Sequence, residues 1–174
     1  NNLIDEIWKR KLKKSKSKIY SLPDSSGGEN YRHKINKVVS NLKKKGADYQ
    51  FITASENNAW LYNIRGLDSE FAPIPNCYSL IDKNKKINFF CDLKKISSSF
   101  RKYFKQIKFL DFKLADKILS KIVRKKFLID KNTCSCYFEN IISKNNKITS
   151  VIDPIYNFKA IKTKKEISNI KRAH

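Results

Sequence analysis

Apolar residues along the chain recur at helical spacing in some segments and form short continuous runs in others. Ile35, Val38, Val39 and Leu42 follow the i, i+3, i+4, i+7 pattern, which predicts a helix from about residues 29–31 to Gly46. Further helices are predicted from Ser55, over 96–104 and 114–122, from Asn132 or Thr133, and from Thr163. Short apolar runs predict strands at 49–53, 77–81, 86–90, 107–110, 126–129 and 148–152.

Strands separated by helices in this order predict an α/β fold, with a mixed β-sheet of five or six strands flanked by helices. The runs Cys77–Ile81 and Lys86–Phe90 are joined by the polar residues 82–85, which predicts a hairpin and argues against a wholly parallel sheet. The chain has 174 residues, of which 40% are hydrophobic, so a single core is expected.

The two ends predict segments that lead to other parts of a longer protein. Residues 1–28 resemble a connector, in which we expect the Trp8 ring to pack against the domain. At the other end, Thr163 and Glu166 form a capping-box sequence, and an apolar stripe follows with no stop signal before His174. We therefore expect a connector arm from a preceding domain over 1–28, a domain over 29–160, and over 161–174 the start of a helix that belongs to a further domain.

The formal net charge of +22 has two interpretations. Only six of the 38 basic residues are arginine, and the lysines are spread along the whole chain, which favours codon usage in an A/T-rich genome. A nucleic-acid-binding surface would use more arginine, whose planar fork binds phosphate and guanine through two hydrogen bonds, so nucleic acid is not the favoured partner. The alternative is a basic binding module, for nucleic acid or for a protein partner.

The chain has few of the cysteine and histidine residues that are typical of metal sites and catalytic centres. Four cysteines show no metal-site spacing, which predicts free thiols and an intracellular protein. His33 and His174 are the only histidines, and neither belongs to a sequence cluster typical of a metal site or a catalytic triad. No segment approaches the roughly 20 apolar residues of a membrane span, and the first residues do not resemble a signal peptide. We therefore expect a cytoplasmic protein with no catalytic or metal-binding residues and no cofactor in this chain.

The segment from Asn58 to Asp68, with the sequence NAWLYNIRGLD, resembles the middle domain of three-domain Xaa-Pro aminopeptidases (aminopeptidase P). An AWL-x-N-x-RG-x-D run is characteristic of that domain. Three further segments match family segments that occur in the same order along the chain: residues 2–8, 128–137 and 154–174. The chain departs from the family pattern at Pro73-Ile74-Pro75, where Asn-Pro is usual, and at 9–18, where lysines replace a stretch that is commonly rich in proline.

This resemblance implies a creatinase/prolidase N-terminal-like fold within a hydrolase that removes the N-terminal residue preceding proline. The family's activity usually depends on two manganese ions, held by two Asp, one His and two Glu. Those ligands belong to a pita-bread catalytic domain that would start near Lys164, so none is expected here, and this chain alone would not be an enzyme. The middle domain would frame access for peptides with proline in second position and would help two subunits to pair as a homodimer.

The resemblance also supplies the candidate site residues. Arg65 and Asp68 flank Gly66 and either line a peptide channel or pair with each other to fix their loop. Trp60 belongs either to the core or to the lip of the substrate channel. His174 matches the end of an R-A-H run in the first helix of the catalytic domain, where a functional role is possible.

Overall fold

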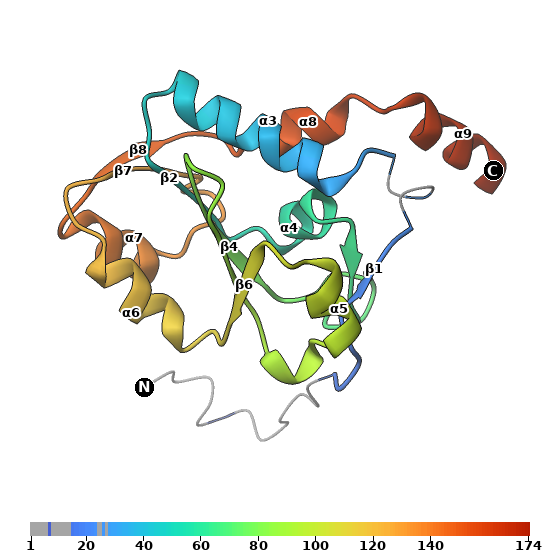
Figure 1. Ribbon diagram of the computed structural model, residues 1–174, viewed down its shortest axis with the longest axis horizontal. Coiled ribbons are helices and arrows are strands. Elements are labelled where there is room, and N and C mark those ends of the chain that lie inside the picture. Colours follow the sequence, from blue (N-terminus) through green and yellow to red (C-terminus); the bar gives the residue numbers. More distant parts are fainter. Residues whose placement is uncertain (1–6, 8–14, 24–25, 27) are drawn as a thin grey trace.

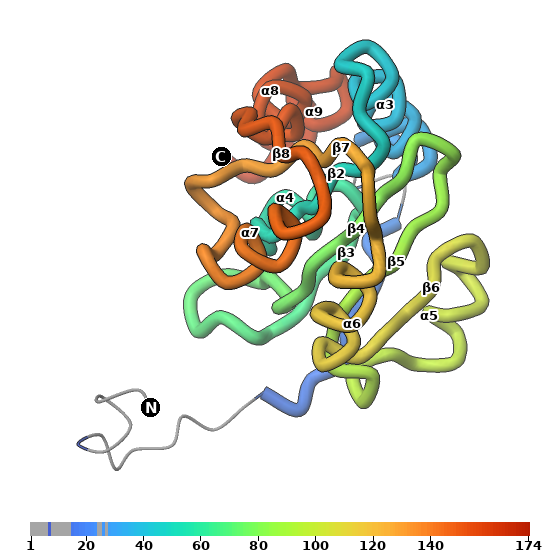
Figure 2. The backbone as a smooth tube through the Cα atoms, turned by 90° about the vertical axis from the view of Figure 1, so that its left-hand side faces the viewer, coloured from blue at the N-terminus to red at the C-terminus, as the bar shows by residue number. Residues whose placement is uncertain are grey.

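A computed structural model of the chain describes residues 7, 15–23, 26 and 28–174. Most of the predicted connector arm, including Trp8, lies outside these described residues. The described part contains a central six-stranded sheet with helices on both faces (Figure 1, Figure 2). This arrangement confirms the α/β fold predicted from the sequence.

The sheet has the strand order β6-β5-β4-β2-β7-β8. Strand β4 runs antiparallel to both of its neighbours, whereas the other three strand pairs are parallel, so the predicted mixed sheet is confirmed. The strand bounds are β2 Tyr49–Ile52, β4 Tyr78–Asp82, β5 Ile87–Phe90, β6 Ile107–Leu110, β7 Lys126–Ile129 and β8 Lys147–Ser150.

The predicted hairpin is present between β4 and β5, where Ile81 lies opposite Ile87. Its turn is closed by the Asp82 carboxylate, which accepts hydrogen bonds from the backbone amides of Asn84 and Lys86, both at 2.8 Å. Lys85 has a φ of 67°, the left-handed conformation that a tight turn of this kind requires.

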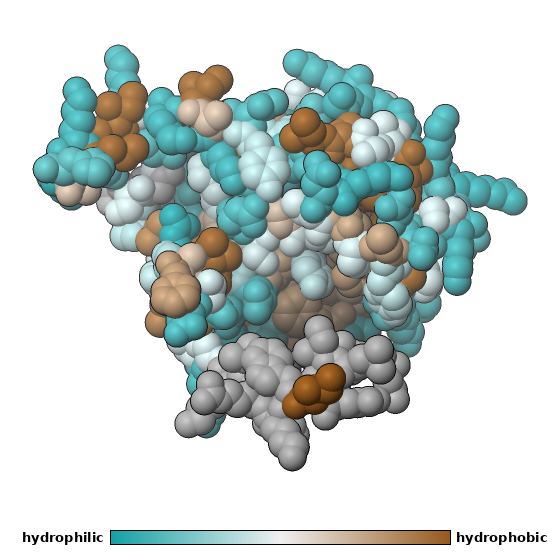
Figure 3. All heavy atoms as spheres, turned by 180° about the vertical axis from the view of Figure 1, so that it is seen from behind, coloured by the Kyte–Doolittle hydropathy of each residue, from teal (hydrophilic) through white to brown (hydrophobic). Residues whose placement is uncertain are grey.

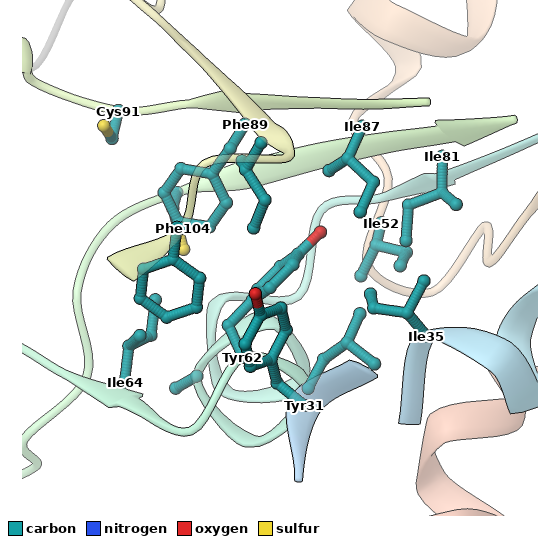
Figure 4. Close-up of a cluster of buried hydrophobic side chains, with 14 of the residues drawn as sticks. Tyr31, Ile35, Ile52, Tyr62, Ile64, Ile81, Ile87, Phe89, Cys91 and Phe104 are labelled. Carbon is teal, nitrogen blue, oxygen red and sulfur yellow. The ribbon is translucent and has the colours of Figure 1, made fainter. Parts of the chain in front are cut away.

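Helices cover the two faces of the sheet as separate layers. Neighbouring residues of one strand face opposite layers, so Phe51 contacts the core under α6 and α7 while Ile52 contacts the core under α3 and α4. Figure 4 shows part of this second, larger core, where Tyr62, Phe89 and Phe104 lie close together. The helix bounds are α3 Tyr31–Lys44, α4 Ser55–Leu61, α5 Ser98–Tyr103, α6 Leu114–Lys121, α7 Cys136–Ser143, α8 Pro154–Ala160 and α9 Lys164–Ala173, with a 3₁₀ turn at Leu93–Lys95.

Several predicted element starts were wrong by a few residues. Helix α7 is capped by Ser135 and not by Asn132 or Thr133, because Asp130 holds these two residues in a turn of their own. Cys134 therefore precedes the helix and is buried, whereas Cys136 is exposed. Helix α4 begins at Ser55 but has no side-chain cap, since Ala54 occupies the cap position. The predicted helix over 96–104 is shorter, and Ser97 caps it.

Two features were missed by sequence reasoning. Helix α8 has Pro154 in its first turn and Asp153 as its cap, an arrangement that Pro favours because its missing N–H would be unpaired there anyway. A small two-stranded antiparallel sheet joins β1 (Tyr20–Ser21) to β3 (Ile64–Arg65). These strands have two residues each, too short to show a hydrophobic period.

Candidate functional site

The segment that carries the family motif forms the end of α4, strand β3 and the loop after it. Asn58 is buried inside α4, and its amide nitrogen donates to the backbone oxygens of Ile52 and Ala54 at 3.1 and 3.0 Å. Asn63 then reverses the chain with a φ of 53°, a left-handed conformation that asparagine tolerates better than most residues. Helix end, reversal and strand thus bring Trp60 and Arg65 onto one side of the domain.

Trp60 is partly buried and packs against the larger core, but its ring also contacts a charge. The Lys34 ammonium lies 4.0 Å from the centre of the indole ring, within the range of a cation–π interaction. The same nitrogen donates to the Trp60 carbonyl oxygen at 2.9 Å and to Oδ1 of Asn63 at 2.5 Å. Burial lowers the pKa of Lys34 to about 8. Sequence reasoning missed Lys34, because it stands among 32 lysines and no local pattern distinguishes it.

Arg65 is half-buried and uses its guanidinium to satisfy backbone oxygens. Nη1 donates to the carbonyl of Ile64 at 2.8 Å and lies 3.5 Å from the carbonyl of Ala59, near the carboxyl end of α4. Burial lowers the pKa of the guanidinium, which still remains charged at neutral pH. Arg65 lies beside β1, where Tyr20 is its partner across the strand pair.

Asp68 does not pair with Arg65, so the alternative in which these two residues pair to fix their loop was wrong. Its carboxylate forms an ion pair with Lys95, and only 5% of the Asp68 side chain and 11% of the Lys95 side chain are exposed. The second carboxylate oxygen accepts from the backbone amide of Asn76 at 2.9 Å. The side chain therefore faces inward and fixes its loop. The loop is also closed at Gly66, where an added Cβ would lie 2.8 Å from Cβ of Pro75.

A second buried polar cluster holds α8 in place, and sequence reasoning missed it. Oδ1 of Asp153 accepts from Nε2 of Gln50 and from the amide of Ile155, both at 3.0 Å, and Oδ2 accepts from Nδ2 of Asn57 at 2.8 Å. The amide of Asp153 in turn donates to Asp130 at 2.9 Å. Burial raises the pKa of Asp153, although these hydrogen bonds oppose the shift. The Asp-Pro dipeptide was the one sequence signal for this cap.

His174 lies at the exposed end of α9, which projects beyond α3 and α8 (Figure 1). The structure places it at this tip, apart from Arg65 and Asp68. Helix α9 begins as predicted, because the Thr163 hydroxyl accepts from the amide of Glu166 while the Glu166 carboxylate accepts from the amide of Thr163. The capping box is thus confirmed.

The described residues do not fit a metal ion, and three of the four cysteines are buried thiols. Among them, no group of three or more His, Cys, Asp and Glu residues lies close enough to hold a metal. Burial raises the pKa of Cys91 to about 12 and that of Cys134 to about 11, and it raises the pKa of Cys77 further above its usual value. These three thiols therefore stay protonated and unreactive at neutral pH. Within the described part of the chain, no helix is long and apolar enough to cross a membrane.

A basic hollow of about 640 Å³ lies at the opposite end of the sheet, where β7 and β8 begin. Its lining contains one carboxylate, Asp48, which already accepts hydrogen bonds from Lys83 and from the backbone amide of Lys126. The basic residues of the lining are Arg124, Lys125, Lys126, Lys144 and Lys147.

Comparison with known proteins identifies relatives along almost the whole chain. The family profile described as Creatinase/Prolidase N-terminal domain matches residues 10–166. Xaa-Pro aminopeptidase ApepP of Drosophila melanogaster is 33% identical over 180 residues, which cover 99% of this chain and 29% of that protein. Xaa-Pro aminopeptidase 1 of Dictyostelium discoideum is 28% identical and is matched over 91% of this chain and 25% of its own length. The chain thus spans less than a third of these relatives.

Two solved structures share the fold. The X-prolyl aminopeptidase of Caenorhabditis elegans, described as a cytosolic enzyme with a di-nuclear active site, superposes with a TM-score of 0.88 at 20% identity. That match covers 100% of this chain and 29% of the other. An Xaa-Pro dipeptidase from Bacillus anthracis superposes with a TM-score of 0.56 at 18% identity over 80% of this chain and 38% of the other.

Proposed function

The chain belongs to the creatinase/prolidase N-terminal domain family, and we propose on that premise that it is the non-catalytic middle domain of a longer Xaa-Pro aminopeptidase. The observation that carries this proposal is the similarity to Xaa-Pro aminopeptidases over 99% of the chain. The longer protein would remove the N-terminal residue of peptides that have proline in second position. Residues 29–160 would be the middle domain, and α9, with His174 at its end, would begin the catalytic domain.

The metals of such an enzyme would be held elsewhere. The residues that the structure describes do not fit a two-metal site, so two divalent ions, manganese in the family that the sequence resembles, would bind in the catalytic domain. We also propose a cytoplasmic homodimer for the longer protein. One relative by fold is described as cytosolic, and exposed apolar residues such as Ile152 and Ile161 offer surface for contacts with another domain or subunit.

Arg65 and Trp60 are the residues through which this domain would act on access of substrate. The Asp68–Lys95 pair and the close contact at Gly66 hold the loop after β3, so Arg65 sits on a rigid support at the domain surface. Its guanidinium would attract the carboxylate side of a peptide, and the partly exposed Trp60 would give an apolar edge. Asp68 faces inward and would support this arrangement without touching substrate.

The test compares the 174-residue chain with the longer protein that contains it, using a peptide with proline in second position and added manganese. We expect no release of the N-terminal residue by the 174-residue chain and clear release by the longer protein. In the longer protein, Arg65→Gln should raise KM several-fold with little change in kcat, whereas Arg101→Gln, on α5, should change neither. Manganese-dependent release by the 174-residue chain alone, or no release by the longer protein, would refute the proposal.

The basic hollow favours a second function, a basic binding module for nucleic acid. Five cations line it, and phosphate contacts by lysine and arginine would give affinity that falls steeply with salt. A gel-shift series with short RNA and DNA tests this function. Binding that weakens with salt and is lost in Arg124→Gln/Lys147→Gln, but kept in Lys102→Gln/Lys105→Gln, would support it. No shift at low salt would exclude it.

A further inference from the structure

Two segments distant in sequence, α3 and the end of α4, meet at one buried ammonium. Lys34 lies on α3, yet it is only 1% exposed, which is rare for a lysine unless its charge is satisfied. Its nitrogen contacts the ring face, the carbonyl of Trp60 and the side chain of Asn63, as described above. Asn63 in turn donates through Nδ2 to the carbonyl of Glu29 at 2.8 Å, which closes the contact back to the start of α3.

The first turn of α9 lies against Gly28, the residue before Glu29. Gly28 has a φ of +74°, and a Cβ added there would lie 2.8 Å from both Cγ of Glu166 and Oγ1 of Thr163. Partial burial alone would raise the pKa of Glu166. Hydrogen bonds from Thr163, the positive charge of Lys34 and a hydrogen bond from Trp60 act against burial, and together they lower this pKa below its usual value. Glu166 is likewise the charged group that most favours the protonated form of Lys34. The charges of Lys34 and Glu166 therefore attract each other between α3 and the first turn of α9, where Gly28 lies against Glu166.

The remainder of α9 has much less support. Ile167 and Ile170 are 43% and 46% exposed, and no residue of the helix is buried. A helix of 10 residues is marginally stable in water on its own. Its direction relative to the domain is therefore controlled by its first turn.

We propose that Lys34 is a positioning residue that, together with Trp60, holds the first turn of α9 to the domain through Glu166. The ammonium contacts Trp60 on α4 and attracts Glu166 on α9, so its charge decides whether the first turn of α9 stays against the domain. If α9 begins a catalytic domain, which rests on the proposed function, the cluster also sets the direction in which that domain leaves this one. This role goes beyond the candidate residues of the motif, because Lys34 lies on a different helix.

A double-mutant cycle in the 174-residue chain tests the proposal by amide hydrogen exchange of residues 167–170. Lys34→Met keeps the aliphatic stem and removes the charge, and Glu166→Gln removes the charge while a glutamine can still complete the capping box. We expect each single change to speed exchange in α9 about fivefold, and the double change to be no faster than either single one. Local opening governs these amides, so a change in global stability does not imitate the effect.

Lys44→Met is the matched control, since Lys44 is an exposed lysine in the last turn of the same helix and is not among the charged groups that act on Lys34. It should leave exchange in α9 unchanged. Unchanged exchange in Lys34→Met, or additive effects in the double variant, would overturn the proposal. If Lys34→Met does not fold, unchanged exchange in Glu166→Gln alone would overturn it.

The pH dependence gives an independent readout. The charged groups that face Lys34 are Glu166 on α9, Glu29 before α3, Arg65 on β3 and Lys37 on α3. Burial lowers the pKa of Lys34 to about 8, and the charge of Glu166 opposes that shift. Opening of α9 while Lys34 stays buried under Trp60 removes the charge of Glu166 and lowers this pKa further, so the attraction is present below about pH 8 and is lost as pH rises through that value. After correction for intrinsic base catalysis, protection of α9 should fall between pH 7 and 9 in the wild type and stay constant in Lys34→Met. A fall of equal size in both proteins would overturn the proposal.

None of these measurements uses peptidase activity. A negative result therefore leaves the proposed function in place, and an inactive longer protein leaves the result on α9 in place.

Discussion

Buried charges in this domain are satisfied by partners that lie far away in the sequence. Asp68 pairs with Lys95, and Lys34 contacts Trp60 and Asn63. The motif identified Arg65, Trp60 and Asp68 as one group, but it carried no information on which side chain faces inward. Arg65, three residues before Asp68, was a natural partner to predict for it, and that pairing was wrong because the Arg65 guanidinium turns to the carbonyls of Ile64 and of Ala59 in α4. Side-chain direction of this kind depends on tertiary packing, which a local pattern does not record.

The Asp68–Lys95 pair gives a prediction at this scale. Asp68→Asn leaves Lys95 buried without a counter-charge, which should lower the free energy of unfolding by about 3 kcal/mol. Lys95→Met should cost a similar amount, and the double variant should recover part of the loss. Urea denaturation measures these changes, with Lys94→Met as the exposed neighbour for comparison. A loss below about 0.5 kcal/mol in Asp68→Asn would mean that the pair does not stabilise the loop.

At the scale of elements, the helices and strands whose apolar residues follow a clear pattern in the sequence were the ones predicted well. The i, i+3, i+4, i+7 residues of α3 are all buried, although the helix buries Tyr31 and Lys34 as well. All six strands of the main sheet were predicted within about two residues of their observed ends. Helix α8 was missed because it has seven residues and depends on its cap at Asp153 more than on an apolar stripe. The cap itself is buried through Gln50 and Asn57, which come from distant elements.

Substitution of Asp153 therefore tests how strongly α8 depends on this buried polar cluster. Asp153→Ala would leave the buried amides of Gln50 and Asn57 without their acceptor and would remove the helix cap, for a combined loss of about 3 kcal/mol. Asp153→Asn should lose less, since asparagine can still cap α8. Asp92→Ala removes a comparable cap from the 3₁₀ turn and should cost only about 1 kcal/mol. Equal midpoints in urea for Asp153→Ala and Asp92→Ala would contradict this account.

For the whole molecule, the unpartnered apolar stripe of α9 and the net charge of +22 act in opposite directions. Figure 3 shows apolar side chains among hydrophilic ones on the projecting part that holds α9. Exposed apolar residues promote association, while like charges repel, so copies of the 174-residue chain should associate more strongly as salt screens the charge. Sedimentation velocity should show this rise with salt and concentration in the wild type but not in Ile167→Ser/Ile170→Ser. Val123→Ser, which alters a 51% exposed residue elsewhere, should behave like the wild type. A wild type that stays monomeric at every salt concentration would show that the stripe has too little apolar area to drive association without a larger partner, such as the proposed catalytic domain.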